Sequence, residues 1–121
     1  MNAARGVPEP EAMLPLTPAV FNILLALADG EKHGYAIMRE VEEATDGRVR
    51  MGPGTLYGSL DRMLKAGLIE ESENRPIPSR DDERRRYYRL SGFGRRVLQA
   101  EASRLSKAVR MARAKKVLSP A

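Results

Sequence analysis

The stretch MGPGTLYGSLDRMLKAGLIE, residues 51–70, decides the fold of this chain. Gly52-Pro53-Gly54 breaks the backbone, and an uninterrupted helical pattern follows over residues 55–66. Gly67 comes next, and glycine commonly ends a helix. The apolar residues of the predicted helix recur at helical spacing and form one stripe: Leu56, Leu60, Met63 and Leu64.

The face of this helix opposite the apolar stripe is small and polar. At about 100° per residue, it collects Thr55, Gly58, Ser59 and Arg62. A face with hydroxyls and one guanidinium, but without bulk, can approach the floor of a nucleic-acid groove closely. Ordinary solvated faces usually carry long Glu and Lys side chains, so the pattern favours a DNA-reading helix modestly over a merely solvated one.

Two helices are predicted ahead of this stretch. Thr17 suits an N-cap and Pro18 the first helical position, and the apolar run behind them predicts a helix to about residue 28. The run is apolar almost all round, so we expect it to be buried on more than one side, one of them against a second subunit. The other helix is predicted over 35–45, and a minimal strand over 49–51 follows it.

Two strands joined by a polar loop are predicted after the helix over 55–66. They cover residues 68–72 and 86–90, and a hairpin placed directly after a helix is called a wing. Charge runs usually face water, so a plain soluble loop is an equally good interpretation of the connection. The tip of the wing carries Arg80, Arg84 and Arg85.

A long helix is predicted over 92–117. A stripe this narrow does not fold back fully on a small domain, so we expect the helix to pack in a homodimer beside the apolar first helix. Its apolar residues are spaced 4, 3, 4, 3, which is a heptad pattern. The predicted dimer interface consists of Val20, Phe21 and Leu24 from the first helix and Leu98, Ala102, Leu105, Val109 and Ala112 from the last.

Length and patterning predict a single domain with two extensions. Residues 1–16 carry three prolines and little periodicity, so we expect a flexible or loosely docked arm. Residues 17–91 are the predicted winged helix-turn-helix domain, and residues 92–118 the predicted dimerisation helix. The arm has no signal-peptide core and no apolar run is long enough to span a membrane, so we expect a cytoplasmic protein without a membrane partner.

The charge of the chain is unevenly distributed. The net charge is +5, but from Arg84 onward twelve Lys and Arg residues stand against one acid, Glu101. A strongly basic third of this kind suggests a polyanionic partner, although a solvated basic helix has the same composition.

Catalytic and metal-binding patterns are missing from the sequence. There is no cysteine and a single histidine, His33, which precedes Gly34 and is most simply a turn or capping residue. The acidic run 81–83 is flanked by arginines that would neutralise it. We therefore expect no enzyme, no metal and no cofactor.

A family resemblance is carried by HGYAIMREVEEATDGRVRMGPGTLYGSLDRMLKAGLIE, residues 33–70, and by RRRYYRLSGFGRRVL, residues 84–98. In this order and spacing they resemble the PadR family of bacterial transcriptional regulators, in its small single-domain subgroup. The resemblance implies a mainly α (α+β) fold: a winged helix-turn-helix with a two-stranded wing and a long C-terminal dimerisation helix. It also implies a repressor that binds a dyad operator in double-stranded DNA as a homodimer.

The resemblance makes residues 55–66 the recognition helix. Tyr35, Thr55, Tyr57 and Ser59 occupy positions that resemble DNA-contacting ones, whereas Gly58 stands where the family commonly has proline and leaves the groove-facing surface open. We expect Arg62 to contact guanine, Thr55 and Ser59 to reach base edges or phosphates, and phosphates to bind Tyr35, Tyr57 and Lys65. The wing arginines Arg80, Arg84 and Arg85 would reach the backbone or the minor groove.

Two other functions fit the sequence less well. A non-sequence-specific nucleic-acid binder would use the basic third, and a winged-helix interaction module would bind an acidic protein. The resemblance also implies a possible small apolar or aromatic effector. Its pocket between subunits could be lined by Met13, Phe21, Leu24 and Met111, although the sequence favours plain core for these apolar residues.

Overall fold

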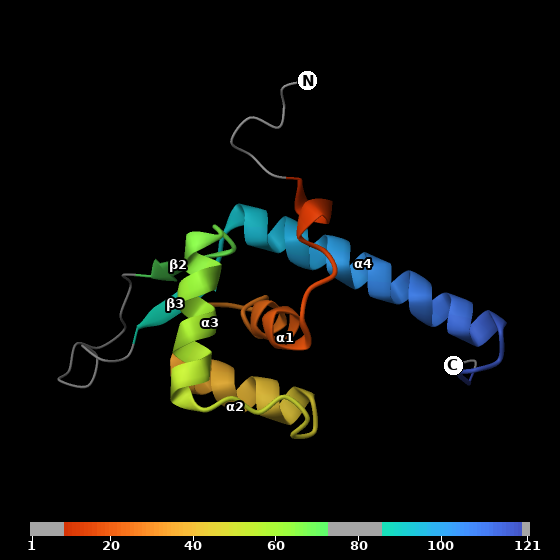
Figure 1. Ribbon diagram of the computed structural model, residues 1–121, viewed down its shortest axis with the longest axis horizontal. Coiled ribbons are helices and arrows are strands. Elements are labelled where there is room, and N and C mark those ends of the chain that lie inside the picture. The colour runs from red at the N-terminus through yellow and green to blue at the C-terminus, as the bar shows by residue number, and fades with distance from the viewer. Residues whose placement is uncertain (1–8, 73–85, 120–121) are drawn as a thin grey trace.

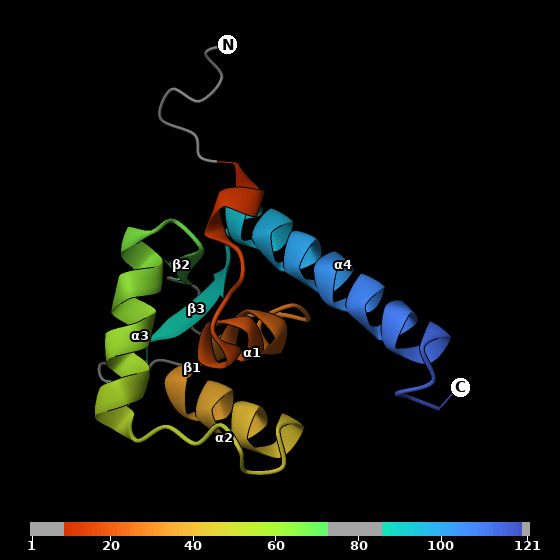
Figure 2. The same ribbon diagram turned by 45° about the vertical axis from the view of Figure 1, so that its right-hand side comes forward.

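The computed structural model describes residues 9–72 and 86–119 (Figure 1). Three helices and a small sheet form a domain, and a fourth helix crosses it and continues well past it (Figures 1 and 2). Along the chain the elements are the 3-10 helix η2 (Pro10–Met13), α1 (Pro18–Ala26), β1 (Lys32–His33), α2 (Gly34–Ala44), α3 (Pro53–Lys65), β2 (Ile69–Ser72), β3 (Tyr87–Leu90) and α4 (Gly92–Ala114).

The helix boundaries follow from caps that the sequence displays. The Thr17 side chain accepts a hydrogen bond from the Val20 N–H at 3.2 Å, and Pro18 begins α1. His33 Nδ1 accepts from the Ala36 N–H at 3.3 Å and so caps α2, which confirms the capping interpretation of this histidine. Gly67 has a φ of +79°, the left-handed conformation that ends α3.

The core lies between the three helices and the sheet, and each element contributes the face that its pattern predicts. The stripe of α3 is buried as expected, with Leu64 only half-buried at its edge. Burial of these apolar side chains is the main stabilising contribution in a domain of this size. The fully buried apolar side chains are Ile23, Leu24, Leu27, Ile37, Val41, Leu56, Leu60, Ile69, Tyr88 and Val97.

The sheet has three antiparallel strands in the order β1-β3-β2. Strands β2 and β3 form the predicted hairpin, with Ile69 opposite Leu90. The third strand is β1, in which Lys32 lies opposite Tyr88, so the predicted strand over 49–51 is wrong. Residues 49–51 lie outside the sheet, and the Val49 N–H donates to the Thr45 hydroxyl at 3.0 Å rather than to a strand.

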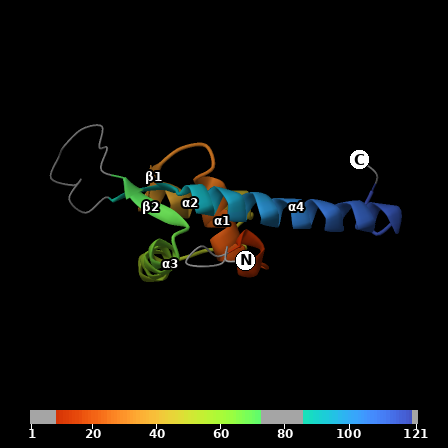
Figure 3. The same ribbon diagram turned by 90° about the horizontal axis from the view of Figure 1, so that it is seen from above.

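Helix α4 is tied to the domain at its start and free of it at its end. The Ser91 hydroxyl accepts from the Gly94 N–H at 2.8 Å and donates to the Gly67 carbonyl at 2.6 Å, which joins α4 to the turn after α3. Val97 and Leu98 are buried, whereas the residues from Ala102 onward are exposed or half-buried. This half of α4 extends away from the other elements (Figures 2 and 3).

The segment 9–17, which we call the arm, is docked rather than loose. η2 packs against α4, and Met13, Leu14 and Leu16 are half-buried against the core. The sequence predicted a flexible or loosely docked arm over residues 1–16, and over the described residues 9–16 the docked alternative holds, because these three apolar side chains give the segment a surface to bury. Residues 1–8 of the predicted flexible arm lie outside the described residues.

Candidate nucleic-acid interface

Helix α3 presents an exposed face that differs from the predicted one by a partial turn. Thr55, Arg62 and Lys65 are exposed, and Gly58 is half-buried between them. Ser59 was expected on this face, but it is only 5% exposed, so that expectation is wrong. Ser59 lies three residues after Leu56 and four before Met63, and its small side chain is buried with them.

Ser59 holds the guanidinium of Arg62 instead of standing on the surface. Arg62 Nη2 donates a hydrogen bond to the Ser59 hydroxyl at 3.2 Å, across one helical turn. Held in this way, the guanidinium keeps further N–H donors of its planar fork for another acceptor.

Asp61 is the residue of this face that the sequence reasoning missed. Its side chain is 65% exposed and lies 3.9 Å from the Lys65 ammonium. The spacing could have revealed it, since Asp61 comes three residues after Gly58 and four before Lys65. An exposed carboxylate here would repel phosphates, yet it could accept a hydrogen bond from a cytosine amino group.

The two tyrosines predicted to reach phosphates have different surroundings. Tyr35, at the start of α2, is 52% exposed. Tyr57 is half-buried, and its hydroxyl lies over Gly34 so closely that a β-carbon there would collide with it. Tyr57 therefore packs α3 against the start of α2, and a larger residue at position 34 would require the Tyr57 side chain to move.

The base of the wing is neutralised by its own strands. Arg86 lies 3.3 Å from Glu71, and Arg89 lies 3.1 Å from Glu70. These pairs are exposed and contribute little to stability, but they leave the base of the hairpin without net charge. The predicted wing residues Arg80, Arg84 and Arg85 lie outside the described residues.

A family model for the PadR-like transcriptional regulators matches residues 23–100, which include α2, α3, the hairpin and the first part of α4. The chain belongs to the PadR family. The resemblance seen in the sequence is therefore confirmed. PadR regulators are non-enzymatic DNA-binding proteins, which agrees with the prediction that the chain is not an enzyme.

Two curated proteins are similar to this PadR chain. The transcriptional regulator Rv3488 of Mycobacterium tuberculosis is 35% identical over 89 residues, which are 74% of this chain and 77% of that protein. An uncharacterised 37.1 kDa protein in transposon TN4556 of Streptomyces fradiae is 38% identical over 85 residues. Those residues are 70% of this chain, but only 22% of the transposon protein.

The predicted winged-helix architecture is confirmed by a solved structure. A PadR family transcription regulator from Clostridium difficile superposes with a TM-score of 0.65 at 22% identity, over 79% of this chain and 95% of that chain. At this identity the likeness concerns the fold, which is mainly helical with a small antiparallel sheet and a long last helix.

The structure places the predicted dimer residues in two groups. Leu24 is completely buried and Leu98 nearly so within the single chain, so neither offers a surface to a partner and both expectations are wrong. The reason is that the first part of α4 packs against α1 within the same chain, and this contact buries Leu24 and Leu98. The remaining residues are half-buried or exposed: Val20, Phe21, Ala102, Leu105, Val109 and Ala112.

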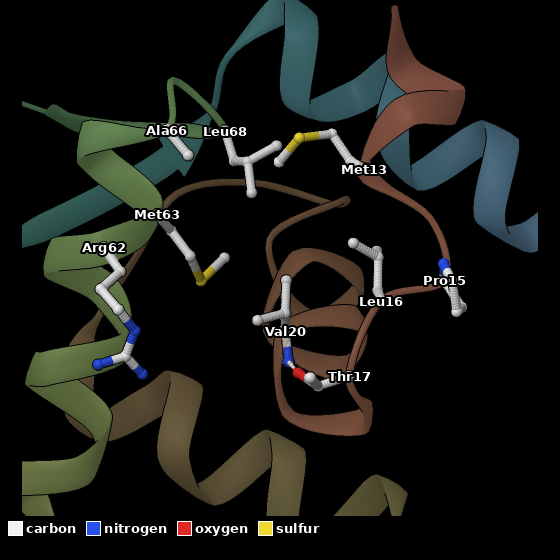
Figure 4. A pocket seen from close by; sticks show the side chains of 9 residues that line it. All are labelled: Met13, Pro15, Leu16, Thr17, Val20, Arg62, Met63, Ala66 and Leu68. Atoms are coloured by element: carbon white, nitrogen blue, oxygen red, sulfur yellow. Dashed lines mark hydrogen bonds between the residues drawn. The ribbon is translucent and has the colours of Figure 1, made fainter.

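An open cavity of about 240 Å³ lies between the arm, α1 and the C-terminal half of α3 (Figure 4). Its walls are apolar apart from Thr17 and Arg62, and Met13 faces it from the arm and Met63 from α3 (Figure 4). Of the four residues predicted to line an effector pocket, only Met13 lines this one. Phe21 is half-buried, Leu24 is in the core and Met111 is half-exposed on the far part of α4.

Over residues 9–72 and 86–119, no three His, Cys, Asp or Glu side chains gather where they could hold a metal ion. In the same part of the chain, no helix combines the length and the apolar character needed to cross a membrane.

Proposed function

We propose that this PadR regulator is a homodimeric repressor that binds a dyad operator, with one α3 helix entering the major groove of each half-site. The observation that carries this proposal is the exposed face of α3, where small residues flank the guanidinium of Arg62. The major groove is wide enough for a helix, and a guanidinium can donate two hydrogen bonds to one guanine. Its place of action would be the cytoplasm.

The proposed contacts divide into those to base edges and those to phosphates. Arg62 and Thr55 would read base edges, while Tyr35 and Lys65 would bind phosphates and fix the register of the helix on DNA. Ser59 would act by orienting Arg62. The wing arginines Arg80, Arg84 and Arg85 would follow the backbone or the adjacent minor groove.

The homodimer is supported by the unpartnered part of α4. Leu105, Val109 and Ala112 continue the stripe that buries Leu98 in the domain, but here Val109 is exposed and the other two are only half-buried. A second copy would cover this stripe, and its two-fold axis would impose dyad symmetry on the operator.

A small apolar or aromatic effector is part of the proposal. The cavity between the arm and α3 has apolar walls beside Arg62, so a molecule bound there would lie against the recognition helix (Figure 4). Such a ligand would change DNA affinity only as far as it binds the free and DNA-bound forms differently.

The test is a binding assay on the promoter next to the protein's own gene, with random duplex as competitor. Preferential binding and a protected two-fold site support the proposal. Equal affinity for all duplexes, with steep salt dependence, would instead support non-sequence-specific binding through the cations of α4, such as Lys107 and Arg110. No protection of any duplex would favour the protein-interaction module.

A further inference from the structure

One acid stands in the basic last helix, and it is buried. Glu101 is 1% exposed, in a helix whose other charged residues are all Arg or Lys. Burying a carboxylate is unfavourable unless partners compensate it, and a buried ion pair often stabilises a fold no better than apolar side chains of the same size. A contribution to the overall stability of the fold therefore does not by itself account for its presence.

The partners of Glu101 come from two places in the chain. Arg104 Nε donates to Oε1 at 2.5 Å, and Arg104 Nη2 donates to Oε2 at 3.0 Å. The backbone N–H of Leu16, in the arm, donates to the same Oε2 at 2.9 Å. The Arg104 pair compensates the charge, while the bond to Leu16 joins residues 85 positions apart.

The backbone N–H of Leu16 is well placed to fix the position of the arm. Pro15 and Pro18 flank this short segment, and proline has no N–H to donate. The Leu16 amide is thus one of few backbone donors available here, and Glu101 fixes its position.

The other side of the arm faces the recognition helix. Met13 and Leu16 form one wall of the cavity whose opposite wall includes Arg62, Met63 and Ala66 of α3 (Figure 4). The arm thus lies between α4 and the C-terminal half of α3. The arm packs on α4 through η2 and on the core through Met13, Leu14 and Leu16, and the bond from Leu16 to Glu101 adds a polar tie on the α4 side.

We propose that Glu101 is a positioning residue for DNA recognition, which holds the arm through the Leu16 amide and so sets the wall against which Arg62 and Met63 lie. The inference rests on the proposed DNA-binding function. It makes the arm a physical connection between the helix with the unpartnered stripe and the helix that reads DNA.

A matched pair of variants isolates the bond between Glu101 and Leu16. Glu101→Leu and Glu101→Gln both remove one negative charge, so both raise non-specific affinity for DNA slightly and equally. Only the glutamine keeps an oxygen that can accept from the Leu16 N–H. The readouts are the affinities for operator and random duplex at one salt concentration, and hydrogen exchange of the Leu16 amide.

We expect Glu101→Leu to fold and dimerise, to lose protection of the Leu16 amide, and to lose about tenfold in its preference for operator over random DNA. Glu101→Gln should stay within about twofold of the wild-type preference. If Glu101→Leu exposes the Leu16 amide but keeps the wild-type preference, the inference is overturned while the proposed function stands. A wild-type protein without operator preference overturns both.

A second variant covers the case in which Glu101→Leu does not fold. Met13→Ala removes part of the arm wall that faces α3 and leaves Glu101 and Leu16 in place. A reduced operator preference, with unchanged affinity for random duplex, supports the inference. An unchanged preference overturns it.

Discussion

Gly94 shows how a single residue fixes the start of the last helix. It lies in the first turn of α4, directly against the backbone of Leu68. A β-carbon at this position would overlap the Leu68 carbonyl oxygen, which already accepts a hydrogen bond from the Ser91 N–H at 3.1 Å. The glycine is required by this approach, since its φ is not in the left-handed region.

Gly94→Ala should therefore destabilise the protein by about 3 kcal/mol, because backbone cannot move aside as a flexible side chain can. Urea unfolding measures the effect. Gly92→Ala is the matched control in the same helical turn, where a β-carbon would meet only Arg96 Nη1 at 3.9 Å. We expect that variant to stay within about 0.5 kcal/mol of wild type. Equal effects would contradict the steric argument.

Arg62 is the residue whose loss should change specificity. Arg62→Ala should relax preference at one base pair, worth about 1–3 kcal/mol, because a bidentate contact to guanine is removed. Lys65→Ala should weaken binding to all sequences and flatten the salt dependence. A randomised binding-site library, selected with each variant, measures both effects. Identical preferences of wild type and Arg62→Ala would show that Arg62 does not read bases.

At this scale the sequence predicts caps well and helix faces less well. Thr17, His33 and Gly67 act as their residue types suggest, because a cap depends on a few neighbouring atoms. The burial of Ser59 depends on which side of α3 meets α2 and the sheet, and periodicity locates that side only to within part of a turn. The hydrogen bond from Arg62 gives the buried Ser59 hydroxyl a partner, which offsets the cost of removing it from water.

Among the elements, α4 departs most from its pattern. The heptad spacing predicted one seam for a partner, yet Leu98 at its start is buried in the chain's own domain and Val109 further along is 38% exposed. The heptad spacing repeats along the whole helix, so it does not show where α4 leaves the domain and becomes exposed. Glu101 lies at that point, and as the one acid in a basic helix it is the feature of the sequence that marks it.

The charge of Glu101 should stabilise the docked arm only where the carboxylate is ionised. The hydrogen bonds from Arg104 hold the pKa of this carboxyl below its ordinary value of 4.5, with a smaller contribution from the Leu16 N–H, although burial opposes them. A lowered pKa means that the stabilisation is complete at neutral pH and is lost as the pH falls below 4.5 towards the folded-state pKa.

We therefore expect the stability difference between wild type and Glu101→Gln to be largest at neutral pH and to shrink on acidification. Urea midpoints of both proteins between pH 7 and pH 3 measure it. The other carboxyl groups titrate in both proteins alike, so their effect on stability drops out of the difference. A difference that stays constant over this range would contradict the lowered pKa.

On the scale of the whole molecule, α3 and the C-terminal end of α4 lie at opposite ends (Figures 1 and 3). The basic residues of the far part of α4 are therefore remote from α3 within one chain, so this part of the C-terminal charge lies away from the proposed DNA-reading face. The ordered motifs predicted the winged helix, because they reflect local geometry. A second copy's position depends on contacts that a single chain does not contain.

Val109 offers the sharpest test of the proposed homodimer. It is exposed on the unpartnered stripe, so Val109→Glu should leave the fold intact but place a charge in the subunit interface, where burial without a partner is unfavourable. Lys107→Glu is the control, since it introduces the same acid on the same helix away from that stripe. Light scattering at micromolar concentration should give a dimer for wild type and Lys107→Glu and a monomer for Val109→Glu.

The monomer should also lose operator affinity by about a hundredfold or more, because linked half-site contacts act at high effective concentration and separate ones do not. The affinity of Val109→Glu for a single half-site should stay near that of wild type, since α3 lies at the other end of the molecule. A wild-type monomer would remove the two-fold operator from the proposal. A dimeric Val109→Glu would move the interface away from this stripe and towards the exposed side of α1, where Val20 and Phe21 lie half-buried.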